Sequence, residues 1–213
     1  MRPTSRLRAA GGLALFCLLA CGGDAAAGVY VQTAAQANAL VAELRKSFTV
    51  RGQPIPPEIF RDMGDGDMAD SGSIWVTVDA AAAVGSNLYY DEIKQEHGWI
   101  SQKKAGSAEE IGYEFIGATS NGLLVAVAAY SGGGSGDFFT LHILDVAVAP
   151  AFDDNGKLYR RINLTLDRSV ALGDRWDGEA KITRNVVTIT KLGPGVGIDS
   201  GKRQTVTIEA VRP

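Results

Sequence analysis

Apolar and polar residues alternate with a period of two in several segments from residue 74 onward. The alternation is clearest in 74–79, 162–167 and 205–209, where Ile, Val or Leu occupies every second position. Turn-rich sequences such as Asn121-Gly122 separate further apolar segments of strand length, namely 97–103, 111–117, 122–130, 138–149, 179–184 and 186–192. This pattern predicts about nine half-buried strands. Because no helical pattern lies between them, we expect the strands to pair antiparallel.

A segment ahead of these strands has the period of a helix instead. Thr33 followed by Gln36 fits a capping box, and it is followed by an apolar stripe formed by Ala37, Leu40, Val41, Leu44 and Phe48. The pattern predicts an amphipathic helix over 33–48, and one further helical turn is expected at 58–63. Together the two periods predict a mainly β fold: an antiparallel sandwich or partly closed barrel of about nine strands, with an N-terminal amphipathic helix packed on it.

The first twenty residues have the layout of a secretory signal. Three arginines precede an apolar run over 9–20, which is too short to cross a bilayer. The run ends in Leu18-Leu19-Ala20-Cys21, which resembles the lipobox of bacterial lipoproteins. The resemblance implies cleavage before Cys21 and attachment of lipid to its thiol. The alternative is cleavage after 25–27, an Ala-x-Ala pattern that would release a soluble periplasmic or secreted protein.

Both alternatives place the mature chain outside the cytoplasm. We expect residues 1–20 to be the signal peptide, 21–29 a tether and 30–213 a single β-rich domain. With lipid on Cys21, the protein would be held at a membrane of the cell envelope and face the periplasm or the cell surface. Gly22, in place of Asp, resembles the sorting sequence of outer-membrane lipoproteins.

Composition and charge narrow the function further. The chain has 213 residues, of which 46% are hydrophobic and 21% charged, as in ordinary globular domains. Residues 1–20 hold three Arg and no acid, so the rest has 18 basic and 24 acidic residues and a net charge of −6. Such a surface repels phosphate backbones, which argues against nucleic-acid binding. The only cysteines are Cys17 and Cys21, which excludes a disulfide, thiol catalysis and a Cys-based zinc site from the β-rich domain.

Four aspartates close together are the first candidate site: Asp62, Asp65, Asp67 and Asp70. Clustered carboxylates are suitable ligands for Ca²⁺. The EF-hand spacing fails, however, because counting from Asp65 puts Val76 at position 12, where the template needs Glu. A solvated acidic loop is the simpler interpretation, so we predict neither a metal nor another cofactor.

A glycine-rich segment over 131–137 is the second candidate. It lies between two apolar strand segments, and its Ser135 could act as a nucleophile with His142 as base. Asp145 would complete a triad, but a regular strand points His142 and Asp145 to opposite faces. The segment also lacks the pattern of a phosphate-binding loop or a nucleophile elbow. A hairpin loop, with His142 as a structural residue, is the simpler interpretation.

Aromatic and acidic residues gather in a connector at 174–179. Trp176 lies among Asp174, Arg175 and Asp177, and these four residues are binding candidates. A flat ring beside carboxylates is a workable platform for a sugar or a basic partner. The alternative is that Trp176 caps the end of the β core and that Arg175 pairs with a neighbouring acid.

Because no complete catalytic set is present, the sequence favours a binding protein over an enzyme. We expect an exported, lipid-anchored envelope protein whose β-rich domain binds a protein or a glycan and whose membrane contact is the lipid. Two alternatives remain open. One is a serine-type hydrolase that uses 131–137 with His142, and the other is a lipocalin-like carrier of an apolar ligand.

Overall fold

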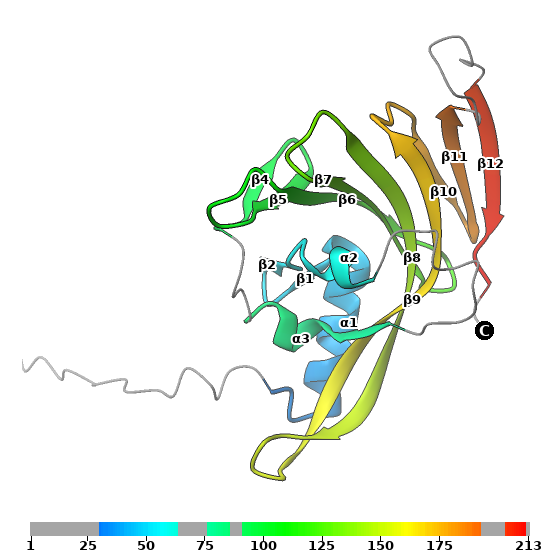
Figure 1. Ribbon diagram of the computed structural model, residues 1–213. Helices are drawn as coiled ribbons and strands as arrows, with labels where there is room; N and C mark the ends of the chain where they lie inside the picture. The colour runs from blue at the N-terminus through cyan, green and yellow to red at the C-terminus, as the bar shows by residue number, and fades with distance from the viewer. Residues whose placement is uncertain (1–29, 64–75, 86–90, 193–202, 212–213) are drawn as a thin grey trace, which may run out of the picture.

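A computed structural model of the chain describes residues 30–63, 76–85, 91–192 and 203–211 (Figure 1). Within these residues the chain forms a large sheet, a smaller sheet packed on its outer face, and helices on its inner face. The mainly β fold predicted from the alternation is confirmed.

Seven antiparallel strands form the large sheet in the order β3-β9-β8-β7-β6-β5-β4. Their bounds are Thr77–Asp79 (β3), Lys94–Glu96 (β4), Trp99–Lys103 (β5), Glu110–Ala118 (β6), Leu124–Ser131 (β7), Asp137–Phe152 (β8) and Leu158–Asp174 (β9). Figure 1 shows that the sheet curls around the helices. It ends in two edge strands, β3 and β4, so it does not close into a barrel, and the sandwich alternative is confirmed.

A three-stranded antiparallel sheet covers part of the outer face of the large sheet. It consists of β10 (Ala180–Thr183), β11 (Val186–Leu192) and β12 (Arg203–Glu209), in that order. Val187 and Ile189 of β11 are fully buried against Leu141 and Ile143 of β8. We call this cluster the outer core.

Helices fill the concave side of the large sheet. They are α1 (Ala34–Ser47), α2 (Ile59–Asp62) and α3 (Ala80–Ala83), and a two-stranded ribbon of β1 (Thr49–Val50) and β2 (Gln53–Pro54) follows α1. The predicted capping box is confirmed, since the backbone N–H of Gln36 donates to Thr33 Oγ1 at 3.2 Å and that of Thr33 donates to Gln36 Oε1 at 3.1 Å. The buried ring of Phe48, which caps α1, stacks on Phe115 of β6. We call this cluster the inner core.

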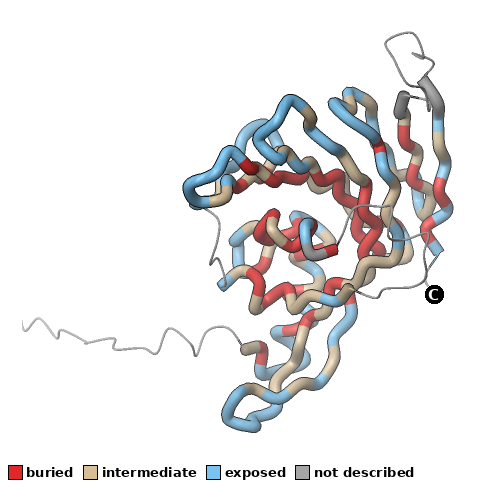
Figure 2. The backbone as a smooth tube through the Cα atoms, in the orientation of Figure 1, coloured by how far each residue is buried: buried red, intermediate tan, exposed pale blue. Residues whose placement is uncertain are grey.

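The side chains of strand β8 point alternately to its two faces, so this one strand contributes residues to both cores. Leu141 and Ile143 face the outer core, whereas Leu144 and Val146 face the inner core. Successive side chains of a strand point to opposite faces, so a strand covered on both sides is apolar throughout its covered length. Figure 2 shows these buried positions concentrated along the middle strands of the large sheet.

The β8–β9 hairpin is longer than the segments 138–149 and 162–167 that the sequence predicts. Gly173, with a φ of 100°, does not end β9, because it still pairs with Phe139. Two bulges interrupt the register of β9, where Asp167 and Leu172 each form an extra residue between consecutive partners of β8. A bulge bends and twists a strand without ending its pairing. The short strands β1, β2 and β4 carry no alternation and were not predicted.

Candidate functional site

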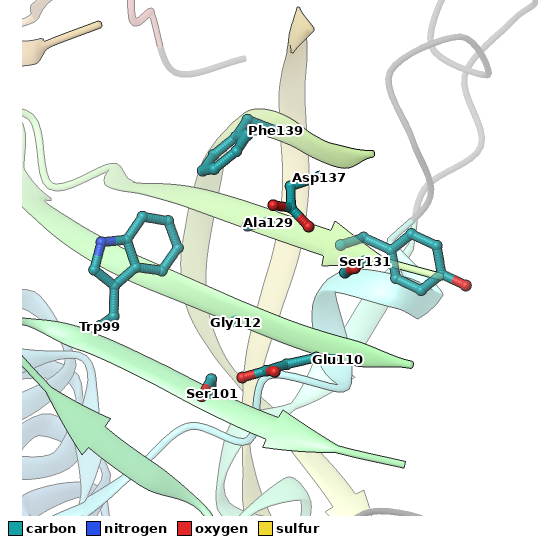
Figure 3. A pocket seen from close by; sticks show the side chains of 9 residues that line it. Trp99, Ser101, Glu110, Gly112, Ala129, Ser131, Asp137 and Phe139 are labelled. Atoms are coloured by element: carbon teal, nitrogen blue, oxygen red, sulfur yellow. The ribbon is translucent and has the colours of Figure 1, made fainter. Parts of the chain in front are cut away.

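A groove opens on the outer face of the large sheet, across β5, β6, β7 and β8 (Figure 3). Its volume is about 340 Å³, which lies within the range of small-molecule sites. The groove lies at the strand ends that border the 131–137 loop. It is therefore built by regular strands, which hold side chains more rigidly than loops do.

Strand register explains why the face is hollow there. Ser101, Gly112, Ala129 and Phe139 stand next to one another in register across the four strands. The two central residues of this row have almost no side chain, so they form a low floor. A Cβ added to Gly112 would lie 3.1 Å from Ser101 Cβ, which shows how closely β5 and β6 pack at this point.

Two aromatic rings stand at one end of this floor. The centroids of Trp99 and Phe139 are 5.9 Å apart and the rings are nearly perpendicular, at 86°. This edge-to-face arrangement is favourable for aromatic pairs and holds both rings in place. Figure 3 shows the rings above the strands, with Gly112 between Trp99 and the polar residues.

A polar row borders the other end of the floor. Lys103, Glu110, Ser131 and Asp137 follow one another in register across β5 to β8. Glu110 and Asp137 flank Ser131 from the two neighbouring strands, so their Cα atoms are about 10 Å apart. Lys103 Nζ lies 3.6 Å from Glu110 Oε2, and both side chains are largely exposed. The groove thus offers carboxylates and hydroxyls beside an aromatic wall.

The structure brings the two sequence candidates 131–137 and 174–179 together beside this groove. The backbone N–H of Asp137 donates to Asp174 Oδ1 at 2.8 Å, and that of Arg175 donates to the Asp137 carbonyl at 2.8 Å. The guanidinium of Arg175 also donates to the carbonyl of Ser135. Asp174 and Arg175 therefore fix the loop that carries one wall of the groove, while Asp177 is exposed.

Trp176 has the contacts expected of a residue that caps the β core, which was the alternative to a binding role. Its Nε1–H donates to the carbonyl of Thr190 at 2.8 Å, and its ring packs on Phe139 with centroids 6.1 Å apart. It is half-buried against the outer core. A Cβ on Gly178 would overlap both the Thr190 carbonyl and the Trp176 ring, so glycine is required there. Trp176 supports the aromatic wall from behind.

The structure does not bring Ser135 and His142 together. Ser135 lies in the exposed loop, whereas His142 lies five residues into β8, about 16 Å along the strand, and only 1% of it is exposed. Its ring faces the inner core, 5.1 Å from the ring of Phe60 in α2, and its Nδ1 has no hydrogen-bond partner. Burial lowers the pKa of His142 to about 4, so the ring is neutral at pH 7.

The remaining candidates lie wholly or partly outside the described residues. Cys21, Asp65, Asp67 and Asp70 are outside them, and Asp62 is the last residue of α2, with no description of its side chain. In the described parts of the chain, no three His, Cys, Asp or Glu side chains gather as metal ligands would. Nor does any helix there have both the length and the apolar character needed to span a bilayer.

Sequence reasoning missed most of the groove. Trp99, Ala129 and Phe139 were assigned to strands and Glu110 was not, and nothing in their local patterns sets these residues side by side. The available signal was a pair of small residues, Gly112 and Ala129, at outward positions of two adjacent strands, with aromatic residues on the strands that flank them. Comparisons of the chain with protein-family models, with curated proteins and with solved structures found no match.

Proposed function

We propose that this chain is an exported, lipid-anchored envelope protein whose β-rich domain binds a glycan in the groove on β5 to β8. The leader with its lipobox-like end supports export and attachment through Cys21. The groove supports ligand binding because it combines a concave shape, aromatic rings and a few polar groups.

The observation that carries the glycan assignment is the pairing of an aromatic wall with a carboxylate-bearing rim. A sugar ring has faces of C–H groups, which pack on the negative face of an aromatic ring such as Trp99. Its hydroxyls donate to carboxylates in short, charge-assisted hydrogen bonds, and Glu110 and Asp137 supply such acceptors. Ser131, between them, can donate or accept.

The charge of the rim selects among glycans. Lys103 offsets the charge of Glu110, so the net negative charge of the rim is that of Asp137, which would repel a carboxylate or phosphate on the ligand; a neutral or amino sugar fits best. The serine-hydrolase alternative is not favoured, because His142, its expected base, is buried on the opposite face of the sheet beside Phe60.

A cationic ligand is the second candidate, and the acidic rim beside Trp99 favours it. Lys or Arg side chains and quaternary amines bind over aromatic faces and pair with carboxylates. Affinities measured at several salt concentrations distinguish a cationic ligand from a neutral sugar. Binding of a cation weakens as ionic strength rises, whereas binding of a neutral sugar changes little.

The test is a panel of neutral, amino and acidic oligosaccharides, measured by calorimetry against the mature full-length protein. We expect binding of a neutral or amino sugar that Trp99→Ala weakens about tenfold or more, through loss of ring contact. The pair Glu110→Gln and Asp137→Asn keeps the shape of the groove and should weaken binding as well.

Phe152→Ser is the matched control, since Phe152 is an exposed aromatic residue at the far end of β8. It should leave sugar affinity unchanged. Equal affinity in the wild-type protein and in Trp99→Ala, or no binding across the panel, would refute the glycan assignment. Melting curves of each variant check that the fold is intact.

A further inference from the structure

The hairpin of β8 and β9 extends past the rest of the large sheet at its turn end. Strand β7 begins at Leu124, which pairs with Leu144, so β8 beyond Leu144 pairs with β9 alone among the described residues. Figure 1 shows this end reaching beyond the body of the domain. The turn is closed by Asp153, whose Oδ1 accepts from the backbone N–H groups of Asn155 and Lys157 at 3.0 and 2.8 Å.

One face of this hairpin end is apolar and exposed. Phe152 is 72% exposed, Leu158 50% and Val148 39%. Phe152 and Leu158 are opposite in register, and the exposed Pro150 lies between Val148 and Phe152 on the same side of β8. We call these four residues the tip face. A contiguous exposed apolar patch of this kind marks an interaction site.

The tip face lies beside the place where the described chain begins. The backbone N–H of Arg160 donates to the Val31 carbonyl at 2.6 Å, and the rings of Tyr30 and Tyr159 are 4.7 Å apart. Arg160 is only two residues from Leu158, about 7 Å along the strand. Nine residues separate Val31 from Cys21, and even a fully extended chain of that length reaches no more than about 35 Å.

Basic residues accompany the apolar ones. Lys157 lies in the turn together with Asp153 and Asp154, and Arg160 pairs with Pro150, within the tip face. Cationic side chains beside aromatic and aliphatic ones are suited to the headgroup layer of a bilayer, where amine and guanidinium groups meet phosphates.

We propose that the tip face rests in the interfacial layer of the membrane to which Cys21 is anchored. This inference rests on the proposed lipid attachment. The lipid on Cys21 would hold only the start of the mature chain, whereas an added apolar contact would also fix the orientation of the domain. Asp137 lies fifteen residues from Phe152, about 50 Å of strand, so the groove is carried away from the lipid surface.

The experiment uses the mature lipidated protein, reconstituted in vesicles of phosphatidylcholine and phosphatidylglycerol. Asn155→Cys in the turn carries a polarity-sensitive fluorophore, and Ser135→Cys carries the same fluorophore at the opposite end of β8. We expect brominated lipids to quench the probe at position 155 at least twofold and to leave the probe at position 135 unaffected.

Adding Phe152→Ser and Leu158→Ser to Asn155→Cys should abolish this quenching while the protein still floats with the vesicles. These side chains are exposed, so the fold should not change. Quenching at both positions, or at neither in a floating protein, overturns the tip contact and leaves the lipid anchor standing. A spectral shift without lipid quenching indicates contact with a second copy of the protein and also overturns it. An unmodified Cys21 in a protein that does not float overturns the anchor and the tip contact together.

Discussion

At its Asp137 end, strand β8 is flanked by β7 and β9, while at its Phe152 end β9 is its only partner among the residues that the structure describes. The first end bears a recess in which polar and aromatic groups from four strands converge, and the second bears a projecting apolar face. A recess needs neighbouring strands to supply its walls, whereas a projection needs their absence. The number of flanking strands therefore decides whether an end of β8 can form a recess, although Phe138 at the Asp137 end is itself 58% exposed.

The alternation of β8 is the same at both ends. Phe139 and Phe152 are both aromatic residues of one strand, yet Phe139 is held between Trp99 and Trp176, while most of the Phe152 side chain is exposed. The support behind Phe139 comes from the smaller sheet, through the hydrogen bond from Trp176 to Thr190. Without the support of Trp176, Phe139 should become more exposed and so resemble Phe152.

Gly178→Val should have the largest effect, because a side chain there would overlap the Thr190 carbonyl and the Trp176 ring. We expect a loss of at least about 3 kcal/mol in the free energy of unfolding, measured by urea denaturation. Gly134→Ala is the control, since a Cβ at Gly134 meets nothing within 4 Å. A change below about 0.5 kcal/mol in Gly178→Val would contradict the role given to Trp176.

His142, which lies between the two ends of β8, should produce a pH dependence of stability. Its pKa is lowered by burial from 6.5 to about 4, so the unfolded state binds the proton more readily between these values. Stability should be constant above pH 6.5 and fall as the pH drops to 4, by up to about 3 kcal/mol from this residue. His142→Leu should remove that part of the slope in unfolding curves recorded across this range. Equal slopes in the two proteins would show that His142 is not responsible.

Asp174→Ala should have the smallest effect and compares the two ends directly. It removes the acceptor for the Asp137 N–H and should cost about 1 kcal/mol, with faster hydrogen exchange at that amide. Asp154→Ala, in the exposed turn at the other end, should change stability by less than about 0.5 kcal/mol. If the two variants behaved alike, the loop beside the groove would not depend on Asp174.

Features that depend on residues close together in the sequence could be predicted from it, whereas features that depend on contacts between distant residues could not. The capping box at Thr33 and the strands near 97–103 and 186–192 follow from local periods, and the structure confirms them. Trp176 could not be assigned, because a loop Trp that binds and a loop Trp that caps have the same local pattern, and only the distant Thr190 decides. The groove depends on register across four strands, to which Trp99 and Phe139 contribute from opposite sides.

The bulge at Asp167 exchanges the faces of β9. Leu164, before it, belongs to the inner core, and Val170, after it, packs on the outer core, although both positions are even-numbered. Even-numbered residues of β9 therefore face the inner core before the bulge at Asp167 and the outer core after it, and no single substitution can reverse this change. Deleting Asp167 would make Leu166 and Arg168 consecutive, as their β8 partners Leu144 and Ile143 already are, so every later side chain could keep its partner and its layer. The presence of an extra residue in β9, and not its identity, therefore sets which side chains reach each core.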